Sequence, residues 1–141
     1  MFSLFRTNYS VRTDGLYVFR LSDISPYGKP FKLTMFLVFN SHHRVIRADT
    51  EGFVDIDKTA IKDMLQDLSD CTELSNECAE YFCDNEHISM KFINSYTHAE
   101  EFKGVITKDG LLLSRILHIK DLEGPRTKVT LQNMNFEFIK A

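Results

Sequence analysis

The chain has 141 residues and a formal net charge of −3, and 43% of its residues are hydrophobic and 26% charged. This size and balance are typical of one globular domain and exclude a wholly disordered chain. No apolar run is long enough to span a membrane as a helix, and no apolar segment behind a basic start indicates a secretory signal. We therefore expect a single domain over 1–141, with residues 1–13 as a tail or as a plug for one end of the core.

Strand patterns dominate the first fifty residues. Residues 16–21 and 31–39 are rich in aromatic and β-branched residues, and a loop with Pro26, Gly28 and Pro30 is predicted between them at 22–30. The segment 31–39 is apolar on both faces, which indicates a strand that is covered on both sides. After a polar turn at 40–43, a shorter strand is predicted at 44–48.

One helix is predicted over 57–68. Apolar residues recur there at helical spacing from Ile56 to Leu68, and Asp55 or Asp57 can cap its start. Residues 70–80 show no clean period.

The second half returns to the alternation of strands. In 87–93, Ile88, Met90 and Phe92 alternate with polar residues, as in a half-buried strand. The other predicted strands are 79–83, 101–107, 111–119 and 127–139, with a bulge near 133–135. About eight strands and one helix predict a mainly β fold, an eight-stranded antiparallel barrel that leaves no long free edge. The alternative is an α+β fold with the helix packed on an antiparallel sheet.

The order of these segments also carries a resemblance. A Phe-rich strand, a turn and a Val-Ile return occur in LYVFRLSDISPYGKPFKLTMFLVFNSHHRVI, and a helix then precedes HISMKF, EFKGVITKDGLLLSRI and NFEFIK. This layout, from Leu16 to Ile139, resembles small calycin and lipocalin-like barrels, although the lipocalin Gly-X-Trp signature is absent because the chain has no Trp. The resemblance implies a barrel with either a central cavity or a well-filled core.

Aromatic residues and one arginine are the candidates for a ligand site in such a barrel. If the odd positions of 111–119 face inward, Arg115 lies inside, where a guanidinium needs a carboxylate that a fatty-acid-like ligand could supply. If the even positions face inward, Arg115 is a surface residue. The predicted ligand-binding residues are Tyr17, Phe19, Phe36, Phe92, Phe102 and Arg115. The alternative is that the aromatic side chains fill the barrel.

The three cysteines offer a metal alternative. Cys71, Cys78, Cys83 and His87 follow the loose spacing of a Cys3His zinc site, but their neighbours are acidic, and the cysteines can equally be small packing residues. We therefore expect no metal and no cofactor. An odd number of cysteines without a signal segment favours a reducing, cytoplasmic location.

Neither charge nor motifs indicate catalysis or nucleic-acid binding. The net charge is +4 over 1–50, −9 over 51–100 and +2 over 101–141, without a basic stripe. Nucleophile-elbow, Walker and dinucleotide-binding motifs are absent, and no histidine stands at a recognisable spacing from a nucleophile. We therefore expect a non-catalytic barrel that binds a small apolar ligand, with no nucleic acid or membrane as partner. The alternative is a protein-interaction module with a filled core and no ligand.

Overall fold

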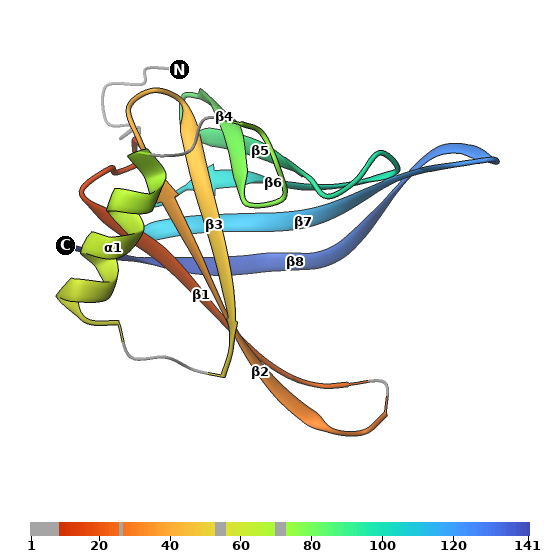
Figure 1. Ribbon diagram of the computed structural model, residues 1–141, viewed down its shortest axis with the longest axis horizontal. Coiled ribbons are helices and arrows are strands. Elements are labelled where there is room, and N and C mark those ends of the chain that lie inside the picture. Colours follow the sequence, from red (N-terminus) through yellow and green to blue (C-terminus); the bar gives the residue numbers. More distant parts are fainter. Residues whose placement is uncertain (1–8, 26, 53–55, 70–72) are drawn as a thin grey trace, which may run out of the picture.

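The computed structural model describes residues 9–25, 27–52, 56–69 and 73–141 (Figure 1). Its eight strands form a closed antiparallel barrel in chain order, in which β8 pairs with β1. The strands are β1 (Gly15–Ile24), β2 (Pro30–Phe39), β3 (Arg44–Glu51), β4 (Cys78–Asp84), β5 (His87–Ile93), β6 (His98–Ile106), β7 (Gly110–Asp121) and β8 (Gly124–Lys140). The helix α1 (Lys58–Ser69) lies between β3 and β4. The predicted mainly β barrel with one helix is confirmed, and the α+β alternative is wrong.

The barrel interior holds the main core. Side chains that alternate along the strands point inward from every strand, and Phe39, Phe92, Phe102 and Phe136 are fully buried among them. At the end of the barrel where β1 begins and β8 ends, Tyr9 and Val11 pack against this core. We call this the terminal end. The opposite end carries the β1–β2, β5–β6 and β7–β8 connections, and we call it the hairpin end.

A second apolar cluster lies outside the barrel, under α1. Leu16 and Val18 of β1 and Phe36 of β2 are buried there against Ile61 and Leu68 of the helix. This cover explains why the predicted strand at 31–39 is apolar on both faces, since its inward residues meet the core and its outward residues meet α1.

The helix begins where its cap predicts. The Asp57 Oδ1 atom accepts a hydrogen bond of 2.8 Å from the backbone N–H of Ala60. This satisfies one of the first backbone donors of the helix, which have no partner within the helix itself. Of the two caps that the sequence offers, Asp57 is the one that the structure describes, whereas Asp55 lies outside the described residues.

The strands β1 and β2 extend further toward the hairpin end than the sequence predicts. The predicted loop at 22–30 is confirmed but is shorter at both ends, because β1 continues to Ile24 and β2 starts at Pro30, with Gly28 at a φ of 78° in the turn. These residues project beyond the core, so their sequence lacks the alternation by which a half-buried strand is recognised. The predicted bulge in β8 is confirmed by a register shift opposite Leu113 and Arg115 and by the φ of 55° at Asn133.

Two hairpins extend from the hairpin end in different directions. β1 and β8 pair over Gly15–Val18 and Glu137–Lys140 and then diverge (Figure 1). The β7–β8 hairpin runs out beside the β5–β6 connection, while the β1–β2 hairpin runs out on its own. The hairpin end therefore presents a larger surface than the cross-section of the barrel.

Candidate functional site

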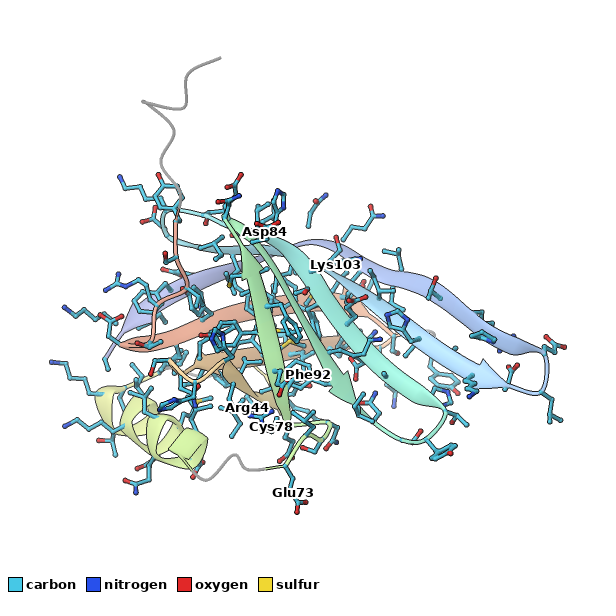
Figure 2. All side chains as sticks on the ribbon, turned by 90° about the horizontal axis from the view of Figure 1, so that it is seen from above. Arg44, Glu73, Cys78, Asp84, Phe92 and Lys103 are labelled. Carbon is cyan, nitrogen blue, oxygen red and sulfur yellow. The ribbon has the colours of Figure 1, made fainter. Side chains whose placement is uncertain are left out.

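Side chains pack densely in the barrel interior. The Tyr17 ring lies 5.4 Å from the Phe39 ring and 5.0 Å from the Phe138 ring, and the Phe92 and Phe102 rings lie 6.0 Å apart. The Phe92 side chain lies within this dense set in Figure 2. An eight-stranded barrel is just wide enough either to be filled by its own side chains or to hold one small ligand.

The predicted aromatic ligand residues divide between inside and outside. Tyr17, Phe92 and Phe102 belong to the interior core, and the half-buried Phe19 packs on Phe136 at 5.3 Å between ring centroids. The placement of Phe36 inside the barrel is wrong, because its side chain points outward and is buried under α1. A strand that is apolar on both faces gives no local signal of which face points inward.

Arg115 faces inward, but the chain itself supplies its carboxylate. The side chain of Glu100 is only 8% exposed. Its Oε2 atom accepts a hydrogen bond of 2.5 Å from Arg115 Nε and forms an ion pair of 3.1 Å with Arg47 Nη1. Its Oε1 atom accepts a hydrogen bond of 2.8 Å from Asn94 Nδ2. Arg115 also donates to Thr130 Oγ1 at 2.7 Å. The predicted surface alternative for Arg115 is therefore wrong, and the carboxylate expected from a ligand is that of Glu100.

This polar cluster lies at the hairpin end of the interior core. The Arg47 guanidinium stands 5.7 Å from the Phe92 ring and 5.4 Å from the Phe102 ring, within the range of cation–π attraction. Burial disfavours the charged form of Glu100, but the hydrogen bonds from Arg115 and Asn94 and the charge of Arg47 outweigh it and lower the pKa of this carboxyl. The carboxylate is therefore held ionised between two guanidinium groups.

The residues of the zinc alternative do not form a site in the part of the chain that the structure describes. Cys78 is disulfide-bonded, Cys83 is an exposed free thiol and His87 is exposed, while Cys71 lies outside the described residues. No group of three His, Cys, Asp or Glu side chains among the described residues gathers as a metal ion requires. A sulfur in a disulfide is not a thiolate ligand, so this form of the protein offers no Cys3His set.

A concave feature at the hairpin end lies on the outer surface of the barrel. This β5–β8 cleft has a volume of about 550 Å³. It is lined by Lys91, Ile93, Ser95, Tyr96, Thr97, His98, Ala99, His118, Ile119, Lys120, Pro125, Arg126 and Thr127. A neighbouring pocket of about 580 Å³ shares six of these residues and adds Asp121 and Leu122 at the tip of the β7–β8 hairpin.

Strand register builds the floor of this cleft. Ile93 pairs with Ala99, Ala99 pairs with His118, and His118 pairs with Thr127, so four strands contribute to one row on the outer face. Directly opposed residues of antiparallel strands point to the same side, and the preceding row, which includes Phe92 and Glu100, points inward. The helix α1 covers β1–β3 and leaves this row uncovered (Figure 1).

Cationic and apolar side chains share the cleft. His118 Nε2 lies 2.9 Å from Glu101 Oε1, and Arg126 lies 2.8 Å from Asp121. Within the described residues, neither Lys91 nor Lys120 has an ion pair. The carboxylates nearby are thus engaged, and the two lysines are left to attract an anion.

No local sequence signal connects the two histidines of this cleft. His98 and His118 are twenty positions apart, and no motif links them. The signal that connects them is the pairing of β6 with β7, which requires the exact register of two strands whose outer faces are only moderately polar.

Comparison with known proteins returned no matching family model, no matching curated protein and no matching solved structure. None of the helical residues that the structure describes forms a helix long and apolar enough to cross a membrane.

Proposed function

We propose that this protein is a non-catalytic interaction module whose calycin-like barrel is a scaffold with a filled core. In this proposal it binds another protein with the surface of its hairpin end. Barrels of eight strands either hold one small ligand or are filled by their own side chains. The packing of Tyr17, Phe92 and Phe102, together with the ion pairs of Glu100 at the hairpin end, supports the filled form.

The exposed apolar side chains at the hairpin end carry this proposal. Tyr27 at the β1–β2 turn is 91% exposed, Tyr96 in the β5–β6 connection is 98% exposed, and Leu122 at the β7–β8 tip is fully exposed. Single exposed apolar residues are ordinary, but here they occupy the tips of three connections at one end of the barrel. Aromatic residues placed in this way are typical of protein-interaction surfaces.

Crosslinking from defined positions tests this proposal. A photoreactive phenylalanine analogue in place of Tyr96 or Leu122 should crosslink to a protein in an extract of the source cells. The same analogue in place of Lys108, in the turn between β6 and β7 at the terminal end, is the matched control. Equal crosslinking from both ends would contradict the assignment of the surface.

A neutral probe separates this proposal from the apolar-ligand alternative. Nile red fluoresces in apolar cavities and carries no charge, so it reports on the barrel interior without being drawn to charged surfaces. We expect no saturable fluorescence increase, and we expect the native mass of the purified chain to equal its denatured mass. A retained organic molecule, or Nile red binding that Phe102→Ala alters, would instead favour a ligand-binding barrel.

A cytoplasmic location stays a prediction. The disulfide at Cys78 is a feature more typical of oxidising compartments. Whether Cys78 is oxidised or reduced in the native protein therefore tests the predicted location.

A further inference from the structure

We infer that the β5–β8 cleft binds an acidic peptide segment of a partner protein, with carboxylates at Lys91 and Lys120 and an apolar side chain against Tyr96. This inference rests on the proposed function and names the chemistry of the partner.

Charge supports an acidic occupant. Among the residues that the structure describes, no carboxylate lines the cleft, whereas Lys91, Lys120 and Arg126 do. The nearest acidic groups are already paired, since Glu101 binds His118 and Asp121 binds Arg126. Lys91 and Lys120 are therefore the cations of the cleft that have no ion pair among the described residues, in a chain whose net charge is −3.

Shape and composition favour a peptide over a smaller anion. The floor crosses four strands, and neighbouring strands lie about 4.8 Å apart, so the floor is about 14 Å long. An extended peptide advances about 3.3 Å per residue, so four or five residues span the cleft. Ile93 and Tyr96 give an apolar side chain a place beside the two lysines.

The same charges argue against a nucleic acid. Asp121 and Glu123 lie at the tip of the β7–β8 hairpin next to the cleft, and Glu101 lies beside its floor. A continuous polyanion would meet these carboxylates as well as the lysines, whereas a peptide can place its few carboxylates only where the cations are. An acidic peptide is therefore the occupant that fits.

Three synthetic heptapeptides test the inference. Each has a central phenylalanine flanked on each side by three identical residues, which are glutamate, glutamine or lysine. Titration into the ¹⁵N-labelled full chain at low salt should shift the amide signals of 91–99 and 118–127 with the glutamate peptide. The glutamine and lysine peptides should bind at least tenfold more weakly, and added salt should weaken the glutamate peptide most.

Charge-reversal variants locate the interaction. The double variant Lys91→Glu with Lys120→Glu should weaken binding of the glutamate peptide at least tenfold. The matched control is Lys103→Glu with Lys108→Glu, which makes the same charge change outside the cleft; Lys103 lies on β6 toward the terminal end (Figure 2). The control should change the affinity less than twofold. A thermal melt of each variant confirms that it is folded.

Several results would overturn the inference. They are equal binding of the glutamate and glutamine peptides, signal shifts outside the cleft, equal loss in both double variants, and no binding of any peptide. Displacement of the peptide by inorganic phosphate or by a thymidine oligonucleotide at constant ionic strength would reassign the cleft to simple anions or to nucleic acid. If crosslinking from Tyr96 succeeds while the peptides fail, the interaction module stands and acidic recognition falls.

Discussion

Replacement of the buried carboxylate by an amide is the sharpest test of the polar cluster at the hairpin end. Glu100→Gln keeps the shape of the side chain but removes the charge that Arg47 and Arg115 share. Breaking a buried ion pair costs about 3–5 kcal/mol. Because the Arg115 side chain is 29% exposed and the amide still accepts hydrogen bonds, we expect a loss of about 2–3 kcal/mol in the free energy of unfolding.

The pH dependence gives this prediction a sign. Folding lowers the pKa of Glu100, so the folded state favours the ionised carboxylate. This contribution to stability is fully present above the ordinary glutamate pKa of about 4.3 and is lost as the pH falls through the lower pKa of the folded state. The stability difference between the wild type and Glu100→Gln should therefore be largest near neutral pH and should shrink in acid.

Urea unfolding followed by circular dichroism measures both quantities, since urea does not screen ion pairs as guanidinium chloride does. Glu101→Gln is the matched control, because the neighbouring Glu101 pairs with His118 on the outer face and should cost no more than about 1 kcal/mol. A loss below about 0.5 kcal/mol for Glu100→Gln would refute the reasoning. A loss that is the same in acid and at neutral pH would refute it as well.

Substitutions at four further positions test the fold itself. Phe102→Ala should cost about 3–5 kcal/mol in urea unfolding because its ring is fully buried, and a cost below 1 kcal/mol would contradict a filled interior. Phe36→Ala should be similarly costly, and nuclear magnetic resonance should place its signal changes in α1 rather than in the interior. Asp57→Ala should cost about 1 kcal/mol through the lost cap, while Asp57→Asn should restore most of it. Gly104→Ala should prevent normal pairing of β6 with β7, because a Cβ there would collide with the Leu112 carbonyl, and an unchanged melting temperature would contradict this.

Local patterns along the chain predict where the regular core strands and the helix lie. The predicted strand at 87–93 matches β5 at both ends, because it alternates between a buried and a solvent face along its whole length. The predicted helix at 57–68 agrees with α1 to within one residue at each end, because an apolar stripe and a capping aspartate are local signals. A closed barrel follows from the number of such strands and their short connections.

The inward face of a strand and the contacts between distant residues depend instead on how the whole barrel is paired and covered. The predicted inward placement of Phe36 is wrong, because its side chain is buried under α1 on the outer face of β2. Since β2 is apolar on both faces, its sequence carries no local signal of which face points into the barrel. The Arg115–Glu100 pair and the β5–β8 cleft depend on the register of β6 with β7, which follows from the packing of the whole barrel. Local sequence encodes the alternation along one strand, whereas the neighbours of a side chain across strands are chosen by the pairing of the complete sheet.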